Sequence, residues 1–423
     1  MTAMRLATAP AARAEGQTRQ RVLGIVFLVL AAIIAVVFTK VPEGAVSTFS
    51  LNLGPNPAIK LPGLVIPSAT TCWVLAAFCG FSGAVQLVRG FGTRWGLVLG
   101  LVALAFTFTF LTWATAGKSV SLVGILQATV ARATPITFAA LSGLLCERAG
   151  VVNIAIEGML LAGAFAGAVA GSISQNPWIG VLAAALVGAA LAWVLAVLAI
   201  RYFVDQIIAG TVINIFSLGI TSFLSARVLQ TNPDLNNPPR LLPVAIPILS
   251  DIPIIGPVLF DHNVFIYGMF VLVIVVNIAL FRTRWGLRVR SVGEHPRAAD
   301  TVGINVLRTR YTNVVLAGMV AGVGGAYLTI GSTGSFDQNM SAGRGFIGLA
   351  AMIFGGWNPF GAFFASLIFG FADSLQARLS ILAVPIPSEF LLMTPYLVTI
   401  VVVAGVVGRV RAPAADGKPY RKE

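Results

Sequence analysis

The sequence of 423 residues is poor in charged residues, histidine and cysteine. Only 10% of its residues are charged, whereas an average soluble domain has about a quarter, so a soluble fold would lack polar surface. The cysteines Cys72, Cys79 and Cys146 have neither metal-ligand spacing nor the even number of a disulfide framework. The only histidines are His262 and His295. These scarcities argue against a histidine–cysteine metal site, and we predict no bound metal.

The sequence also lacks the motifs of a catalytic or nucleotide-hydrolysing site. Thr112–Ser119 ends in Gly-Lys-Ser but is missing the first glycine of a phosphate-binding loop, and it follows an apolar run instead of a strand. Neither a nucleophile elbow nor a His-Glu-x-x-His motif is present. We therefore predict that the chain has no catalytic residues, is not an enzyme and does not hydrolyse ATP.

Hydrophobic residues are abundant instead, at 57% of the chain. They recur in runs of about 18 residues or more, each long enough to cross a hydrocarbon core. Because backbone groups in lipid must be bonded internally, these runs are predicted to be helices. The predicted fold class is all-α, a polytopic helical membrane protein with roughly 10–12 transmembrane segments. The expected apolar regions are Val22–Thr39, Leu64–Val88, Trp95–Ala116, Leu122–Leu145, Ile154–Ser172, Trp178–Ile200, Ile207–Val228, Val264–Phe281, Asn313–Ile330, Phe346–Ala377 and Phe390–Val407.

The formal charge of +13 is distributed as in a membrane protein. Most of the 28 lysines and arginines lie at the N-terminus, in short loops, in the loop 282–311 and in the tail 409–423. The positive-inside rule places these segments, and therefore both termini, in the cytoplasm. This distribution predicts that the chain lies in the lipid bilayer, and it argues against nucleic acid as a binding partner. Residues 1–21, polar and basic, are predicted to be a disordered cytoplasmic segment.

The region Phe346–Ala377 is too long for one span and contains Gly355-Gly356-Trp357-Asn358-Pro359 near its middle. Two cytoplasmic termini require an even number of crossings, whereas the apolar regions are odd in number. We therefore predict a broken or re-entrant helix near residues 346–377, of the kind that lines transport paths. The alternative is a simple kink filled by neighbouring helices.

Four polar residues in apolar surroundings are candidates for a substrate path: Asn153, Glu157, Asn214 and Asn358. Asn153 and Glu157 are four residues apart and share a helix face, and charged residues at membrane depth are usually functional. Asn214 could bond a ligand or serve only to join helices. The preceding pair Glu147 and Arg148 could equally lie in a solvated turn.

Glycines repeat at intervals of four in two of the expected spans. Gly163, Gly167 and Gly171 form one such ladder, and Gly318 and Gly322 form another. Small residues at this spacing predict close contacts between helices.

The loop 286–310 contains a predicted helix of about two turns. Pro296 lies in its first turn and Gly303 is at the position that commonly ends a helix. So short a helix is not stable alone and needs a partner surface, unless it is an amphipathic helix lying on the membrane.

Three ordered blocks of sequence resemble bacterial ABC-importer permeases of the branched-chain amino acid/ribose/nucleoside superfamily, most closely the nucleoside (simple sugar) branch. The first block is Glu147–Met159, with Glu-Arg-Ala-Gly-Val-Val-Asn-Ile-Ala-Ile-Glu-Gly-Met. The second, Val292–Asn305, is similar to the family's ATPase-coupling segment. The third combines Gly345–Ala350, Gly355–Pro359 and Phe369-Gly370. The resemblance extends over 122–408 and leaves the spans in 22–116 as an N-terminal addition.

The resemblance implies a permease subunit of an ATP-driven importer in the bacterial cytoplasmic (inner) membrane, working by alternating access, with nucleosides as the expected substrate. Its implied partners are a second related permease, a cytoplasmic ATP-binding subunit and an extracytoplasmic substrate-binding lipoprotein. ATP would be used by the ATPase, and this chain would bind no cofactor. The permease domain would cover 117–408. A permease for simple sugars and a stand-alone ion-coupled transporter are the alternatives. The residues implied in ATPase coupling are Gly293, Glu294, His295, Pro296, Arg297, Ala298 and Ala299.

Overall fold

The computed structural model describes residues 9–42, 44–53, 59–382 and 411–422. The helices in these ranges are α1 (Ala9–Ile33), α2 (Ser68–Val88), α3 (Trp95–Ala114), α4 (Leu122–Glu147), α5 (Ile156–Ser174), α6 (Pro177–Ala196), α7 (Gln206–Leu224), α8 (Ile255–Leu259), α9 (Val264–Arg282), α10 (Arg284–Glu294), α11 (Pro296–Thr301), α12 (Val306–Ala326), α13 (Arg344–Phe354) and α14 (Pro359–Ile381). The strands are β1 (Val46–Ser50), β2 (Leu64–Pro67), β3 (Ser119–Ser121), β4 (Val244–Ala245) and β5 (Asp261–His262).

The predicted all-α membrane fold is confirmed. The described residues contain 10 helices that are long and apolar enough to cross a membrane, some of them extended by a π-helical turn. They are α1, α2, α3, α4, α5, α6, α7, α9, α12 and α14. The remaining predicted span, 390–407, lies outside the described residues.

The predicted break in the region 346–377 is present. α13 ends at Phe354 and α14 begins at Pro359, so a four-residue turn separates a half-length helix from a full span. Proline fits the first position of α14, where its missing N–H has no intrahelical partner. The turn contains Gly356 at φ 66° and Trp357 at φ 51°, both in the left-handed region.

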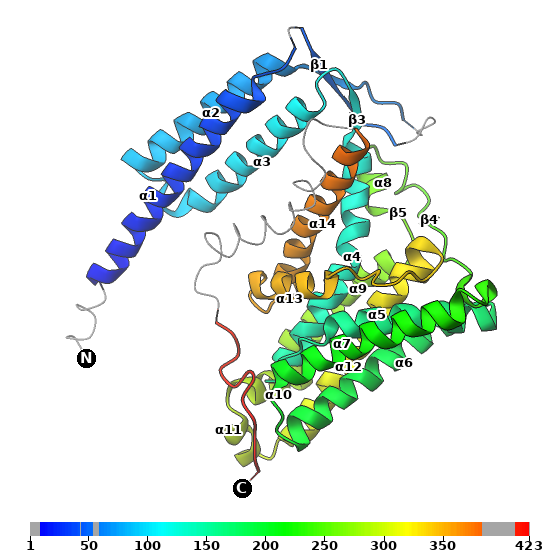
Figure 1. The fold of residues 1–423 in the computed structure, drawn as a ribbon. Helices are drawn as coiled ribbons and strands as arrows, with labels where there is room; N and C mark the ends of the chain where they lie inside the picture. Colours follow the sequence, from blue (N-terminus) through cyan, green and yellow to red (C-terminus); the bar gives the residue numbers. More distant parts are fainter. Residues whose placement is uncertain (1–8, 43, 54–58, 383–410, 423) are drawn as a thin grey trace. The chain divides into compact units, whose positions relative to one another are not determined.

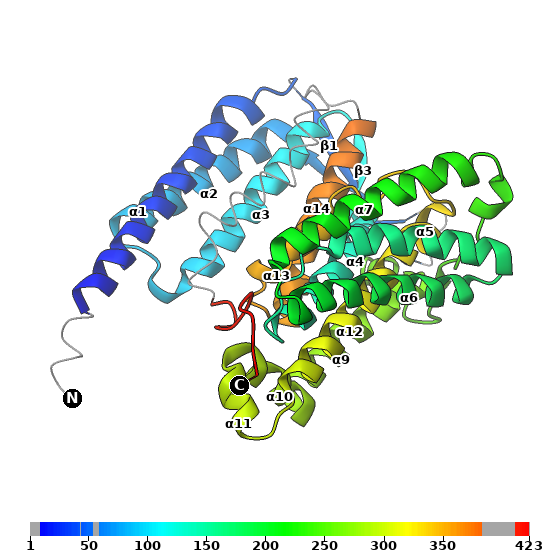
Figure 2. The ribbon, with the colours of Figure 1, turned by 60° about the horizontal axis from the view of Figure 1, so that its bottom comes forward.

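The chain divides into an N-terminal unit, Met1–Gly124 with Leu379–Ile386, and a main unit, Ile125–Arg378 with Pro387–Glu423. In the N-terminal unit, α1, α2 and α3 lie side by side (Figures 1 and 2). A side chain at Gly83 of α2 would come within 2.9 Å of Leu28 of α1, so glycine permits this close crossing. The ring of Phe38 stacks on Trp113 at 5.2 Å.

Two features of the N-terminal unit differ from the sequence predictions. α1 already begins at Ala9, within the stretch 1–21 that composition predicts to be disordered, where alanine favours helix. Residues 64–67, expected to start a span, form β2 instead, because they pair with β1 in a sheet of order β2-β1-β3. β1 and β2 are antiparallel, and β1 and β3 are parallel.

The main unit is built around contacts among α5, α6 and α12, which lie side by side in Figures 1 and 2. The predicted glycine ladders meet here. A side chain at Gly163 of α5 would come within 2.7 Å of the Gly322 carbonyl oxygen of α12, and one at Gly322 would collide with the Ala184 carbonyl of α6. The ladders therefore serve close backbone packing of three helices.

Candidate functional site

Glu157, at the start of α5, holds the N-terminus of α13. Its Oε1 accepts hydrogen bonds from the Ser341 hydroxyl at 2.6 Å and the Gly343 amide at 2.8 Å. Its Oε2 accepts from the Gly345 amide at 2.6 Å. The first amides of a helix have no intrahelical partner and carry partial positive charge, so a buried carboxylate is well matched to them.

Asn214 of α7 joins the same region from the other side. Its Oδ1 accepts from the Gly158 amide at 2.7 Å, and its Nδ2 donates to the Ile154 carbonyl at 2.8 Å. Asn153 is fully buried nearby; its Nδ2 lies 3.8 Å from the Met159 sulfur, and its Oδ1 has no hydrogen-bond partner within the described residues. The irregular backbone that precedes α5 is therefore fixed by amide side chains.

The turn between α13 and α14 is fastened to the end of α4. Trp357 Nε1 donates to Glu147 Oε2 at 2.6 Å. The Arg148 guanidinium donates to the Trp357 carbonyl from Nε at 3.0 Å and from Nη2 at 2.6 Å. Asn358 caps α14, because its Oδ1 accepts from the amides of Phe360 and Gly361.

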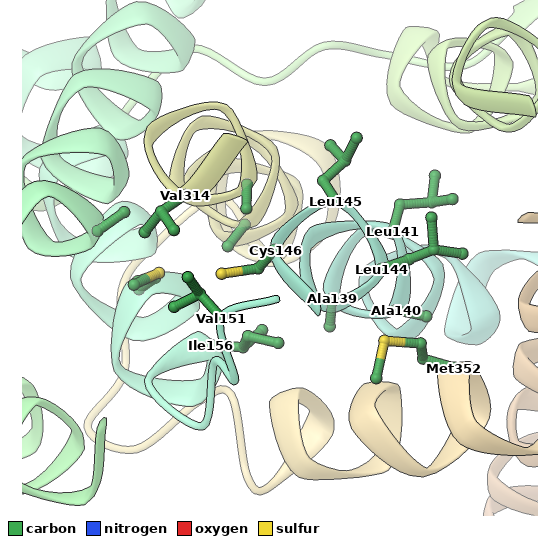
Figure 3. Close-up of a cluster of buried hydrophobic side chains, with 14 of the residues drawn as sticks. Ala139, Ala140, Leu141, Leu144, Leu145, Cys146, Val151, Ile156, Val314 and Met352 are labelled. Atoms are coloured by element: carbon green, nitrogen blue, oxygen red, sulfur yellow. The ribbon is translucent and has the colours of Figure 1, made fainter. Parts of the chain in front are cut away.

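Between its two attached ends, α13 packs on α4 through an apolar core. Figure 3 shows Met352 of α13 beside α4, with Cys146, Val151 and Ile156 in the same cluster. A side chain at Gly348 would collide with Ala139 of α4, so the two helices are in direct contact. α4, the start of α5 and α13 thus form one bonded and packed assembly.

The segment implied in ATPase coupling forms two helices, of which only the second, α11, was predicted. α10 and α11 lie together at one end of the main unit (Figures 1 and 2). Gly303, at φ 82°, follows the end of α11 as predicted. Ala299 is buried with Val292 and Val306, whereas Ala298 is exposed. α11 therefore has one anchored face and one available face.

The tail 411–422 packs against this segment. The Ala415 amide donates to the Gly293 carbonyl at 2.9 Å, and the Ala414 amide donates to Glu294 Oε2 at 3.1 Å. Tyr420 is buried in the same apolar cluster as Ala299. A groove of about 600 Å³ lies between the tail and the exposed residues Glu294, His295, Arg297 and Ala298, with Pro296 half-buried at its edge.

Charged groups meet beneath the tail. Arg310 is 2% exposed and donates from Nη1 to the Lys418 carbonyl at 2.9 Å. Burial raises the pKa of Asp416 to about 6, while its hydrogen bond with Glu147 and the charge of Arg310 oppose the rise. Burial also lowers the pKa of Arg148.

A second charged cluster lies within the spans and joins residues distant in sequence. Arg132 of α4 donates from Nη1 to Asp373 Oδ2 of α14 at 2.8 Å. Arg344 Nη2, from the first residue of α13, lies 3.8 Å from the same oxygen. Arg132 and Asp373 are 241 residues apart, so the sequence gives no sign of this pairing.

The predicted site residues fall into two places. Glu157, Asn153 and Asn214 lie around the start of α5, whereas Asn358 lies at the other end of α13. The side-chain oxygens of Glu157, Asn214 and Asn358 accept hydrogen bonds from backbone amides or from Ser341, and a role of these residues in a substrate path stays a prediction. Of the predicted coupling residues, Gly293 and Ala299 are buried and the others are exposed or half-buried.

A helix interrupted within a polytopic helical bundle is typical of membrane transport proteins. The family described as "Branched-chain amino acid transport system / permease component" matches residues 125–407, more than half of the chain. The chain belongs to this family and is a permease component. The match begins at residue 125, where the main unit begins, so residues 1–124 lie outside it.

Individual relatives carry more specific names. The guanosine ABC transporter permease protein NupQ of Bacillus subtilis is 39% identical over 310 residues, covering 70% of this chain and 96% of the relative. The nucleoside ABC transporter permease protein NupC of Lactococcus lactis is 40% identical over 318 residues, covering 71% and 99%. The putative glucose ABC transporter permease protein TsgC13 of Haloferax volcanii is 35% identical over 255 residues, covering 60% and 77%. No solved structure matches the chain.

Proposed function

We propose that this chain is a transmembrane subunit of an ATP-driven importer for nucleosides. The observation that carries the proposal is the two-faced helix α11. Ala299 is buried on one face of α11, whereas Arg297 and Ala298 are exposed. Glu294, at the end of α10, is also exposed. A helix of six residues cannot be stable alone, and its anchorage presents a rigid surface to a partner.

The importer would contain the partners that an ABC permease needs. A cytoplasmic ATP-binding subunit would dock on α11, a second related permease would complete the path, and an extracytoplasmic lipoprotein would deliver the substrate. This chain would bind no ATP or other cofactor itself. Both termini and the α10–α11 segment would lie in the cytoplasm of a bacterial cell, in accordance with their basic residues.

Movement of the ATPase would reach the spans through contacts already in place. α11 is attached to α10 and the tail, and the last turn of α10 contacts the loop that follows α4. α4 in turn carries α13 and holds the turn before α14. Alternating access would follow from displacement of this assembly relative to the other spans.

The substrate class rests on the named relatives. The two nucleoside permeases match at 39% and 40% identity over nearly their whole length. Sugar import is the second candidate, supported by the putative glucose permease at 35% identity over 77% of its length.

The test is uptake by vesicles that contain this chain with the second permease, the ATP-binding subunit and the substrate-binding lipoprotein. We expect ATP-dependent uptake of labelled guanosine and none of labelled glucose. Vesicles that contain the chain without the ATPase serve as the control. Guanosine uptake in those vesicles under an ion gradient would contradict the proposal and identify a stand-alone secondary transporter, and glucose uptake would establish the sugar alternative.

A further inference from the structure

The cluster of Arg132, Asp373 and Arg344 lies deep in the spans of the main unit. At 1.5 Å per residue, Arg132 is about 15 Å from the start of α4 at Leu122 and Asp373 about 12 Å from the end of α14 at Ile381. These two ends lie on the same side, because Ser374 donates to the Ile125 carbonyl at 3.1 Å. Both charged residues therefore lie inside apolar spans, two to three helical turns from the nearer end of their own helix.

The three side chains are only partly covered by the protein. The side chains of Arg132, Asp373 and Arg344 are 36%, 23% and 24% exposed. Lipid next to such charges is unfavourable, and charged residues within membrane spans normally face a bundle interior or a water-filled cavity. Glu157, by contrast, is 9% exposed and all of its contacts are internal.

The cluster also has bonding capacity left over. Both arginines approach the same oxygen of Asp373, Oδ2, and within the described residues no hydrogen bond is made to its Oδ1. Arg132 uses Nη1 for this pair, and a guanidinium has five N–H donors. Acceptor and donor atoms are therefore presented together within the spans, beside the half-length helix α13.

We infer that Asp373 and Arg132 contact the substrate during its passage. The inference rests on the proposed function and names its binding site. The matching ligand chemistry is a neutral molecule with adjacent hydroxyl groups, which donate to the Asp373 carboxylate, and with carbonyl or ring-nitrogen acceptors for Arg132. A ribonucleoside has both, whereas a purely apolar ligand has neither. Arg344 holds Asp373 in place, because its Nη1 already donates to the Met340 carbonyl at 2.9 Å.

Accessibility is the first measurement, and it does not depend on the substrate. The native thiols Cys72, Cys79 and Cys146 are buried, which gives a low background. In the assembled importer, Asp373→Cys should react with a charged, lipid-insoluble methanethiosulfonate reagent. Ile368→Cys, on the same helix and 50% exposed as an apolar side chain, is the matched control and should not react. An unreactive Asp373→Cys would overturn the inference.

Uptake is the second measurement. Asp373→Asn should lower ATP-dependent guanosine uptake about tenfold or more, because an interaction with a charged group is lost. It should also lower the ratio of guanosine uptake to 2′,3′-dideoxyguanosine uptake. The substitution leaves the selectivity of the lipoprotein unchanged. Ser374→Ala, next in sequence but buried and bonded to α4, should retain wild-type uptake and preference.

A charge exchange separates substrate contact from a structural ion pair. The double variant Arg132→Asp with Asp373→Arg keeps an ion pair between α4 and α14 but reverses the donor and acceptor positions. Recovery of guanosine uptake in this variant would show a structural pair and overturn the inference. Because the arginine introduced at position 373 would face Arg344, continued loss supports contact when the variant melts at the wild-type temperature. If the wild-type importer does not take up guanosine at all, the proposed function fails, whereas thiol accessibility remains measurable.

Discussion

Replacing Glu157 with alanine should release the start of α13. The change removes one hydrogen bond from the Ser341 hydroxyl and two from the amides of Gly343 and Gly345. A hydrogen bond to a charged group contributes about 1.5–3 kcal/mol, but three bonds to one carboxylate are not additive. A buried donor left without its partner costs about 1–3 kcal/mol, and we expect the free energy of unfolding to decrease by at least this amount.

The assay is thermal unfolding of the purified permease in detergent, with uptake measured in parallel. Glu157→Gln gives a graded comparison, because its carbonyl oxygen can still accept from Ser341 and Gly343 while its NH₂ group faces the Gly345 amide. We expect a smaller decrease in melting temperature for this variant than for Glu157→Ala. Asp337→Ala, which removes an exposed carboxylate from the loop before α13, is the matched control and should melt as the wild type does.

Two results would refute this reasoning. If Glu157→Ala melts at the wild-type temperature, the carboxylate does not anchor α13. If Glu157→Gln loses uptake with no change in melting temperature, the residue acts on the substrate path, as its sequence context predicted. An anchoring role requires that the losses of stability and of uptake rise together across the two variants.

Three further changes test other parts of the molecule. Ala298→Trp, on the exposed face of α11, should abolish ATP-coupled uptake without preventing membrane insertion. Co-purification of the ATP-binding subunit measures the lost contact. Normal uptake by this variant would exclude docking of the subunit on this face of α11. Asn214→Ala removes both hydrogen bonds to the start of α5 and should lower the free energy of unfolding by about 1–3 kcal/mol in thermal melts, whereas Asn232→Ala, at an exposed position, should not. Because the pKa of Asp416 is raised to about 6 when the tail is packed, packing should be strongest at acid pH and weaken as pH rises from about 4 to about 6. Limited proteolysis of the tail at several pH values measures this, and Asp416→Asn should remove the dependence.

The spans and the break could be predicted because their causes are local. An apolar run of sufficient length has to become a helix in lipid, and Gly355–Pro359 interrupts one such run with residues that end and restart helices. Pro296 and Gly303 likewise indicated where α11 begins and where it ends. β2 was missed because its partner β1 lies outside the predicted apolar regions. An apolar four-residue strand also resembles the start of a span.

The roles of polar residues were less predictable for a physical reason. A carboxylate or amide in an apolar segment must find a partner, and the partner can be a substrate or the backbone of a distant helix. Glu157, Asn214 and Asn358 are bonded to backbone groups, which the sequence does not reveal. Arg132 and Asp373 are distant in the sequence, and only the packing of α14 on α4 brings them together.

The contact between the α10–α11 segment and the loop after α4 has a mechanical consequence. A side chain at Gly293 would collide with the Arg148 carbonyl, and one at Gly150 would lie 3.2 Å from the Ala415 carbonyl oxygen. The backbone of α10 and that of the loop after α4 therefore touch at Gly293 with no rotatable side chain between them. A side chain between two helices can absorb a displacement by changing its rotamer, whereas two backbones in direct contact can absorb very little. A small displacement of α11 would thus pass through α10 to α4 with little loss, and a methyl group added at Gly293 would force these two backbones apart.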